Sequence, residues 1–240
     1  MKPTLFVADL HLCRARPDIS LAFFRFLTDT APGAQALYIL GDLFEYWAGD
    51  DDLADPFNAE VASALAALGE NGVAVALMHG NRDFLLGEVF ARASGTSLLP
   101  DPSLIDLYGT PTLLMHGDTL CTADRAYMEF RIKVRDPLWQ QAFLARPLEE
   151  REAIIQGMRR ESTREQAHKE PDILDVSPDA VAAALRRHHY PRLIHGHTHR
   201  PARHSVQVDG RTCERWVLPA WYGRGGYLCC DPSGCHALPA

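Results

Sequence analysis

The chain has 240 residues, of which 47% are hydrophobic, so it can form one domain with a substantial core. Its 31 acidic and 24 basic residues give a net charge of −7, which argues against a general nucleic-acid binder, because such proteins need excess Lys and Arg. No apolar run approaches the roughly 18 residues of a spanning helix, and no secretory signal pattern is present, so we expect a soluble cytoplasmic protein.

Short strand-like runs alternate with helical segments over the first half of the chain. The predicted strands cover 5–8, 36–40, 73–78 and 112–115, and the predicted helices cover 19–29, 58–71 and 84–94. This alternation is typical of a largely parallel sheet with helices on its faces. Later runs at 193–195, 205–208 and 215–218, separated by turns, predict antiparallel sheet. Residues 1–240 are therefore predicted to form one α/β domain, a four-layer α/β/β/α sandwich of two mixed sheets.

Residues 122–188 interrupt the rhythm of strands and are predicted to form a helical cap inserted into this domain. The helix is expected to break at Pro137, Pro147 and Pro171. Residues 125–170 contain ten Lys or Arg and eight Asp or Glu, so this stretch carries +2 and the remainder −9. An apolar stripe either packs the cap onto the body or lines a groove for apolar chains; its residues are Tyr127, Phe130, Val134 and Leu138.

Six cysteines are present, and none forms a C-x-x-C pair. In a reducing cytosol we expect them to be small buried hydrophobic residues. The alternative is a metal site made of Cys229, Cys230, Cys235 and His236, although their spacing is poor for that purpose.

Five short polar motifs come directly after strand-like runs. They are Asp9-Leu10-His11, Gly41-Asp42, Gly80-Asn81-Arg82-Asp83, His116-Gly117-Asp118 and Gly196-His197-Thr198-His199. Loops at the carboxyl ends of strands converge in open α/β sheets, so these loops are predicted to meet. Their carboxylate, amide and imidazole groups suit Mn²⁺, Fe²⁺, Zn²⁺ or Co²⁺. Seven ligands are too many for one catalytic ion and favour two ions roughly 3.5–4 Å apart that share a carboxylate.

The order of these motifs, D-x-H, G-D, G-N-x-D, H-G and G-H-x-H, resembles the calcineurin-like metallophosphoesterase superfamily. The resemblance implies a first ion held by Asp9, His11, Asp42 and His199. It implies a second ion held by Asp42, Asn81, His116 and His197, with Asp42 bridging the two. Water activated by the ions would then attack phosphorus. The implied catalytic residues are Asn81, Arg82, His116 and His197.

Arg82 departs from the pattern of many members, which carry His at this position of Gly-Asn-His-Asp/Glu. Arg cannot be a general acid near neutral pH, but its guanidinium can hold phosphate oxygens at two points. The substitution favours a diphosphate substrate, or a leaving group that needs little protonation.

Longer strings resemble the UDP-2,3-diacylglucosamine hydrolase family over nearly the whole chain. They lie at 6–13, 38–44, 79–87, 115–121 and 194–201. The resemblance implies an enzyme that uses two Mn²⁺ ions and water to cleave the diphosphate of UDP-2,3-diacylglucosamine at the α-phosphorus. The products would be UMP and 2,3-diacylglucosamine 1-phosphate (lipid X), in the lipid A biosynthesis of Gram-negative bacteria. It also implies peripheral attachment to the cytoplasmic face of the inner membrane, with no nucleic acid and no obligate protein partner.

The same resemblance implies a set of substrate contacts: Asn81, Arg82, Asp124, Ser162, Gln166, Lys169 and His197. Ser162 and Lys169 could instead lie on an exposed helix surface, and Asp124 could cap the following helix. Five cations of the cap are further expected to face the anionic leaflet: Arg131, Lys133, Arg135, Arg159 and Arg160. Two alternative functions remain, a hydrolase of soluble nucleotides such as dinucleoside polyphosphates and a non-catalytic scaffold.

Overall fold

The computed structural model describes residues 1–166, 171–222 and 225–240, without the side chains of 165, 166, 171 and 172. The strands are β1 (Thr4–Val7), β2 (Ala36–Leu40), β3 (Ala74–Met78), β4 (Ser97–Leu99), β5 (Ser103–Leu107), β6 (Thr110–Met115), β7 (Arg192–His195), β8 (Ala202–Val208), β9 (Arg211–Val217), β10 (Tyr227–Asp231) and β11 (Gly234–Leu238). The helices are α1 (Pro17–Arg25), α2 (Pro56–Glu70), α3 (Glu88–Ser94), α4 (Arg125–Val134), α5 (Pro137–Leu144), α6 (Leu148–Gln166) and α7 (Pro178–Arg187). Short helical turns are η1 (Phe26–Thr30), η2 (Ala31–Gly33), η3 (Asp50–Ala54), η4 (Asp118–Leu120) and η5 (Pro171–Leu174).

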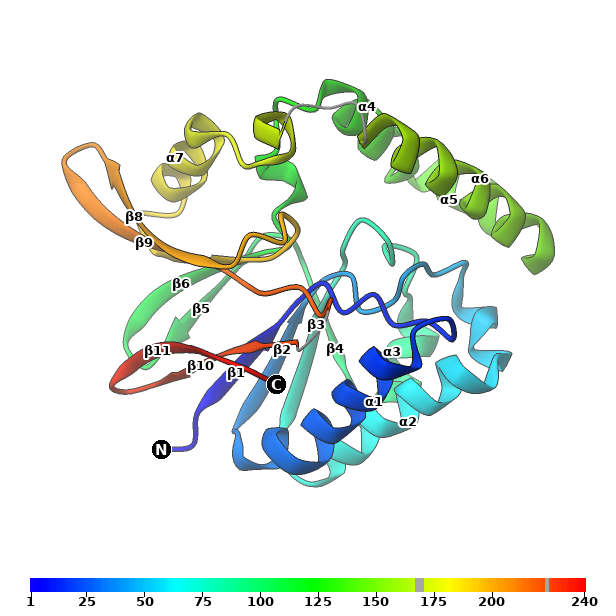
Figure 1. Cartoon of the computed structure of the whole chain (residues 1–240), viewed down its shortest axis with the longest axis horizontal. Coiled ribbons are helices and arrows are strands. Elements are labelled where there is room, and N and C mark those ends of the chain that lie inside the picture. Colours follow the sequence, from blue (N-terminus) through cyan, green and yellow to red (C-terminus); the bar gives the residue numbers. More distant parts are fainter. Residues whose placement is uncertain (167–170, 223–224) are drawn as a thin grey trace.

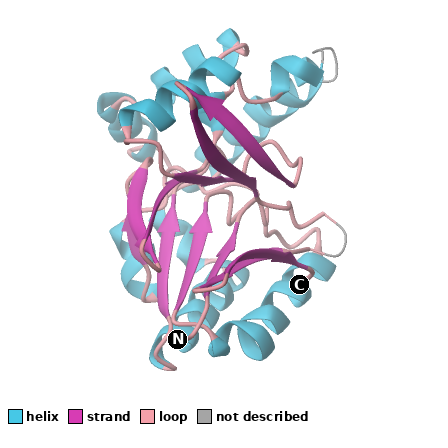
Figure 2. Cartoon of the chain, turned by 90° about the vertical axis from the view of Figure 1, so that its left-hand side faces the viewer, coloured by secondary structure: helices cyan, strands magenta, loops and turns pink. Residues whose placement is uncertain are grey.

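Two mixed sheets stack between layers of helices (Figure 2). The first sheet has the order β11-β10-β1-β2-β3-β4, with β1 to β4 parallel and β10 antiparallel to β1. The second has the order β5-β6-β7-β9-β8, with β6, β7 and β9 parallel. Phe6 and Leu40 of the first sheet and Leu114 and Ile194 of the second share one buried cluster. The core between the sheets is therefore built from the inner faces of both.

Helices cover the outer face of each sheet. Phe23 of α1, Leu65 of α2 and Phe90 of α3 pack in one cluster with the outward side chains of the first sheet. Leu185 of α7 packs with Leu193 and its neighbours on the second sheet. The layers are thus α/β/β/α, and the predicted fold class is confirmed.

Helices α4, α5 and α6 form the cap, which lies across one end of the molecule beyond the carboxyl ends of β1, β2 and β3 (Figure 1). The stretch 122–188 therefore contains two kinds of helix, because α7 packs on the second sheet rather than in the cap. The breaks at Pro137 and Pro147 lie at the starts of α5 and α6, as expected.

The observed elements differ from the predicted ones in three respects. Helix α3 begins at Glu88 rather than at residue 84. The carboxylate of Asp50 caps the helix there, because it accepts hydrogen bonds from the amides of Gly87, Val89 and Phe90. Strand β7, predicted in antiparallel sheet, pairs in parallel with both β6 and β9. Strands β4, β5, β10 and β11 were not predicted at all.

The expectation for the cysteines also needs a correction. The β10–β11 hairpin places Cys230 opposite Cys235, and the two form a disulfide. That bond removes two thiols from the alternative metal site with Cys229 and His236. Cys121 and Cys213 are buried free thiols, as expected.

Candidate metal centre and adjoining cavity

The five polar motifs lie in loops after β1, β2, β3, β6 and β7, at the end of the molecule that faces the cap (Figure 1). Backbone hydrogen bonds join these loops in pairs. The amide of Asp9 donates to the carbonyl of Gly41 at 3.1 Å, and the amide of Gly196 donates to the carbonyl of His116 at 2.8 Å. The loops therefore meet at one place and fix one another's position.

Five of the seven predicted metal ligands have a backbone conformation that L-residues rarely adopt. The φ angle is 54° at Asp9, 51° at His11, 54° at Asp42, 68° at His197 and 55° at His199. Only four other non-glycine residues in the described chain have positive φ. Each such conformation costs roughly 1–3 kcal/mol and persists where the surrounding structure holds it, which is typical of functional sites.

The first ligand group surrounds Asp9. Its Oδ1 lies 3.4 Å from Nε2 of His199, and this nitrogen lies 3.4 Å from Nε2 of His11. The same nitrogen of His11 lies 3.7 Å from Oδ2 of Asp42. Carboxylate oxygens and imidazole nitrogens from three different loops thus face a common point.

The second ligand group begins on the other side of Asp42. Its Oδ2 lies 3.9 Å from Nε2 of His116. Oδ1 of Asn81 lies 3.0 Å from that nitrogen and 3.0 Å from Nδ1 of His197. All seven predicted ligands therefore form one unbroken series of close approaches, with Asp42 in its middle.

The hydrogen bonds of these side chains leave the right atoms for a metal. The backbone amide of Arg82 donates to Oδ1 of Asp42, and that of His197 donates to Oδ2 of Asp9, both at 2.8 Å. The other oxygen of each carboxylate faces the imidazoles. A Cβ on Gly80 would overlap the carboxylate of Asp42, so glycine is required for this close approach. Oδ1 of Asp9 is buried without a hydrogen-bond partner in the described chain.

The tautomer of His116 supports the same conclusion. Its Nδ1 bonds to the carbonyl of Leu40 at 2.9 Å, and a carbonyl can only accept, so Nδ1 carries a proton. In the neutral ring Nε2 then carries a lone pair and no proton, and this nitrogen faces Oδ1 of Asn81, which is also a hydrogen-bond acceptor. Because the pKa of this ring is raised, a proton on Nε2 joins the two atoms in the metal-free chain, and a divalent cation can take the place of that proton, so the donor set fits a divalent metal.

The pKa values show that the centre is short of positive charge. Burial lowers the pKa of His11 to about 3 and that of His197 to about 4, so both rings are neutral, as metal ligands must be. Burial raises the pKa of Asp42 to about 7. Burial acts to lower the pKa of His116, but the charges of Asp42 and Asp118 raise it to about 9. A bound cation would neutralise this buried negative charge.

An apolar cavity of about 250 Å³ opens beside Asn81 and His197. The cap contributes most of its apolar wall, through Tyr127, Phe130, Trp139, Phe143, Ile155 and Met158. The predicted apolar stripe of the cap partly lines this cavity and is partly buried against neighbouring residues. Tyr127 and Phe130 line the cavity, Val134 is buried, and Leu138 is exposed at the start of α5.

Five of the seven predicted substrate contacts line this cavity: Asn81, Arg82, Asp124, Ser162 and His197. Asp124 also caps α4, because its Oδ1 accepts a hydrogen bond from the amide of Tyr127 at 3.1 Å. Gln166 is the last residue of α6, and its side chain lies outside the described part of the chain, as does the whole of Lys169.

Two residues beside His11 were missed by sequence analysis. Oε2 of Glu45 lies 3.4 Å from Nδ1 of His11. The ring of Tyr222 stacks on that of His11 with 5.5 Å between centroids, and lies 5.3 Å from the ring of His199. The position of Glu45 just after the Gly41-Asp42 motif was a usable signal. No motif marks Tyr222, which follows β9 by several residues.

The expected membrane-facing cations of the cap need a correction. Three of the five donate to groups of the body: Arg131, Arg135 and Arg159. They turn inward because buried acceptors, a carboxylate and a carbonyl among them, need donors. Lys133 and Arg160 remain exposed.

Comparison with known proteins places the chain. A family model described as calcineurin-like phosphoesterase matches residues 2–201. A UDP-2,3-diacylglucosamine hydrolase of Aromatoleum aromaticum is 56% identical over 230 residues, covering 96% of this chain and 94% of the relative. The chain belongs to the UDP-2,3-diacylglucosamine hydrolases of the calcineurin-like phosphoesterase family. Proteins of the same name from Aeromonas hydrophila and Pseudomonas paraeruginosa are each 51% identical, over 95% and 98% of both chains respectively.

Membership in this family makes the chain a hydrolase and confirms the resemblance found in its motifs. The matched region includes all five motifs. Within residues 1–166, 171–222 and 225–240, no helix is long and apolar enough to cross a membrane.

Proposed function

We propose that this enzyme hydrolyses the diphosphate of UDP-2,3-diacylglucosamine at the α-phosphorus, giving UMP and 2,3-diacylglucosamine 1-phosphate for lipid A biosynthesis. The observation that carries the proposal is the junction of the metal centre with the apolar cavity. Asn81 and His197 belong to both. Groups suited to phosphate chemistry thus adjoin a chamber suited to acyl chains, and the relatives compared above bear the name of this substrate.

Two Mn²⁺ ions are the proposed cofactors. Asp9, His11, Asp42 and His199 would hold the first ion, and Asp42, Asn81, His116 and His197 the second. When bound, the two ions supply an activated water and neutralise charge on the phosphoryl oxygens. The central position of Asp42, whose Oδ2 faces His11 on one side and His116 on the other, supports a shared carboxylate.

Arg82 is the proposed phosphate clamp. It lies in the cavity wall next to Asn81, and within the described chain its guanidinium has no hydrogen bond or ion pair. A guanidinium placed there can donate two parallel hydrogen bonds to phosphate oxygens. Such a clamp stabilises negative charge on the phosphate oxygens without acting as the general acid.

The cap cavity supports a lipid rather than a soluble nucleotide. Each buried methylene contributes about 0.8 kcal/mol, so two acyl chains gain binding energy from this wall that a soluble nucleotide cannot. Asp124 and Ser162 supply polar groups at the same wall and are proposed to contact the sugar, with Gln166 and Lys169 as further contacts. Because the substrate is a membrane lipid, we place the enzyme on the cytoplasmic face of the inner membrane.

Hydrolysis of UDP-2,3-diacylglucosamine with Mn²⁺ in oxygen-18-labelled water tests the proposal, with UDP-N-acetylglucosamine as the control. We expect label in UMP and no turnover of the control, which would establish attack at the α-phosphorus and a need for acyl chains. Label in the lipid product would contradict the site of attack. A chain that binds metal but leaves the lipid intact would point to soluble nucleotides instead.

A further inference from the structure

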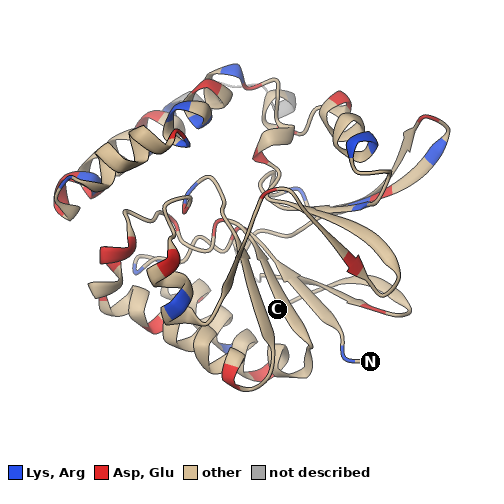
Figure 3. Ribbon diagram, turned by 180° about the vertical axis from the view of Figure 1, so that it is seen from behind, with Lys and Arg blue, Asp and Glu red and all other residues tan. Residues whose placement is uncertain are grey.

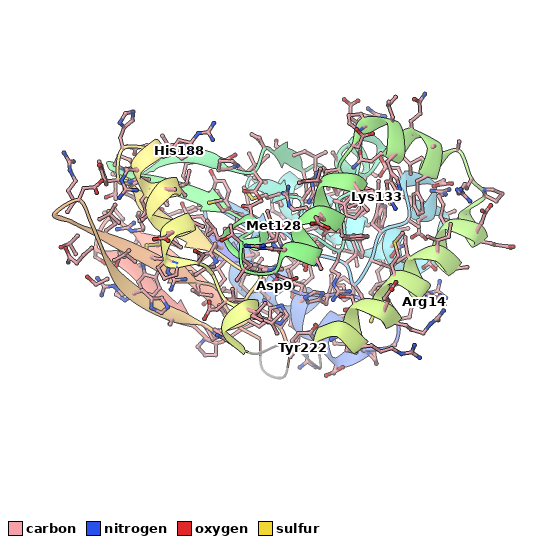
Figure 4. The ribbon with its side chains drawn as sticks, turned by 90° about the horizontal axis from the view of Figure 1, so that it is seen from above. Asp9, Arg14, Met128, Lys133, His188 and Tyr222 are labelled. Carbon is pink, nitrogen blue, oxygen red and sulfur yellow. A yellow bond between two sulfur atoms is a disulfide. The ribbon has the colours of Figure 1, made fainter. Side chains whose placement is uncertain are left out.

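A second cavity, of about 590 Å³, adjoins the other end of the metal-ligand series. Tyr222, which stacks on His11, lines it. The apolar cavity instead begins at Asn81 and His197. In Figure 4, Tyr222 and Met128 of α4 lie on opposite sides of Asp9. Two cavities therefore adjoin the ligand series, one reaching Tyr222 beside His11 and the other reaching Asn81 and His197.

The two cavities share a wall. Glu45, Tyr46 and Arg159 line both of them, and Arg159 of the cap pairs with Glu45. Glu45 also lies 3.4 Å from the ring of His11, so the shared wall stands directly beside the metal centre. A ligand with a diphosphate between two unlike halves could place one half on each side of this wall.

The charges of the second cavity are nearly balanced. Arg14 pairs with Asp55 at 2.6 Å, and Arg16 and Arg159 both pair with Glu45. With Asp52, the lining holds three Arg and three acidic side chains, so a polyanion gains little net attraction there. The cavity therefore suits an uncharged polar group whose phosphate is held elsewhere, at the metal centre.

Flat aromatic surfaces and one amide complete the lining. Tyr46, Phe57 and Tyr222 line the cavity. Arg16 lies over the ring of Tyr222 at 4.8 Å and Arg159 over the ring of Tyr46 at 5.9 Å, so Phe57 is the ring we assign to stacking on a nucleobase. The amide of Asn58 uses one N–H to bond the carbonyl of Asp52 at 3.1 Å. Its second N–H and its carbonyl oxygen have no partner in the described chain. A primary amide with both groups open can pair with the adjacent N–H and carbonyl of a uracil ring.

We infer that the second cavity binds the nucleoside half of the substrate, with the uracil at the Phe57–Asn58 end and the ribose toward Tyr222. This inference rests on the proposed function, which supplies the uridine. Its size lies in the range of small-molecule pockets, roughly 300–1,000 Å³. The α-phosphate then falls between the chambers, beside the metal ligands, and the acyl chains extend into the apolar cavity.

Calorimetric binding of UMP, and separately of 2,3-diacylglucosamine 1-phosphate, to the Mn²⁺-loaded chain tests the inference. We expect Asn58→Ala to weaken UMP about tenfold, because a paired amide is lost, and to leave the lipid's affinity unchanged. Phe57→Leu keeps an apolar side chain for the core but removes a stacking ring, so it should weaken UMP by a similar factor. The matched control is Asn71→Ala, at the far end of the same helix, which should change neither affinity.

Unchanged UMP affinity in both variants would overturn the inference, and so would a wild-type chain that binds the lipid product but not UMP. Loss of UMP binding in Met158→Ala, a change in the apolar cavity, would place the nucleoside in the wrong chamber and also overturn it. A wild-type chain that binds neither product and does not hydrolyse the lipid would instead remove the proposed function itself.

Discussion

Asp42 has both a strained backbone conformation and a buried carboxylate, and each of these costs folding free energy. Its backbone has a φ of 54°, and its carboxylate is buried with a pKa raised to about 7. The carboxylate of Asp83 accepts hydrogen bonds from the amides of Asp42 and Leu43, and the amide of Arg82 donates to Oδ1 of Asp42. These bonds hold Oδ2 between the two ligand groups. The strain is tolerated because the position of that oxygen depends on it.

We predict that Asp42→Asn removes metal from both ligand groups. The amide keeps the shape but loses the negative charge that both ions would share, so turnover should fall by at least about 100-fold. Metal content after dialysis, measured by mass spectrometry, checks this, with the exposed Asp29→Asn as the control. A variant that retains two ions per chain and wild-type turnover would refute the bridging role.

Helix α4 is anchored to the body by one buried carboxylate. Oδ2 of Asp118 accepts a hydrogen bond from the hydroxyl of Tyr127 at 2.5 Å and one from Nε of Arg131 at 2.6 Å. Burial acts to raise the pKa of Asp118, but the positive charges of His116 and Arg131 and the bond from Tyr127 hold it well below its usual range. The cap's first helix is thereby tied to the loop that carries His116.

This anchor predicts a pH-dependent loss of stability in Asp118→Asn. A depressed carboxyl pKa stabilises the fold above the unfolded value of about 3.9, and that contribution is lost as pH falls further. Leaving Arg131 without its buried partner should lower the free energy of unfolding by about 3 kcal/mol at pH 7. The difference from wild type should shrink as pH falls below about 4.

Urea unfolding of the metal-free chain at pH 7 and at pH 3 measures this difference. Asp209→Asn is the matched control, since its carboxylate pairs with Arg186 at an exposed position and should matter little. An Asp118→Asn variant as stable as wild type at pH 7 would show that the anchor contributes nothing.

The cap helices form the outer surface of the molecule over the metal centre. Figure 3 shows acidic and basic residues interspersed along the cap helices rather than gathered on one face. Among the large apolar side chains described in the cap, the two most exposed are Ile132 at 70% and Leu138 at 74%. Lys133, between them in sequence, is exposed as well. Apolar side chains beside a cation suit the interface of an anionic membrane.

We predict that Ile132→Ser combined with Leu138→Ser weakens binding to vesicles containing phosphatidylglycerol at least tenfold, by about the transfer energy of two partly buried side chains. Sedimentation with the vesicles measures the effect, and turnover of detergent-solubilised substrate should stay unchanged. Leu21→Ser on α1, where the leucine is 57% exposed, is the control. Equal vesicle binding in the double variant and wild type would exclude this surface as the contact.

Local patterns carried the predictions that succeeded. Strand β2 was placed at its observed bounds, and β1 and β3 within one residue, because buried parallel strands are continuous apolar runs. The seven predicted ligands could be proposed because each lies in a short motif directly after its strand. The start of α3 failed for the opposite reason: Asp50, far away in sequence, caps it.

The amino-acid sequence by itself determined the fold class, the hydrolase family and the types of side chain predicted to bind metal, since all of these depend on residues close together in the chain. Only the tertiary structure decided which groups face one another. His11 and His199 are 188 positions apart in the sequence, yet their Nε2 atoms lie 3.4 Å from each other. The place of Asp42 between two ligand groups, the stacking of Tyr222 on His11 and the wall between the two cavities have the same origin. They arise where two sheets and the cap pack together, and no local pattern records that packing.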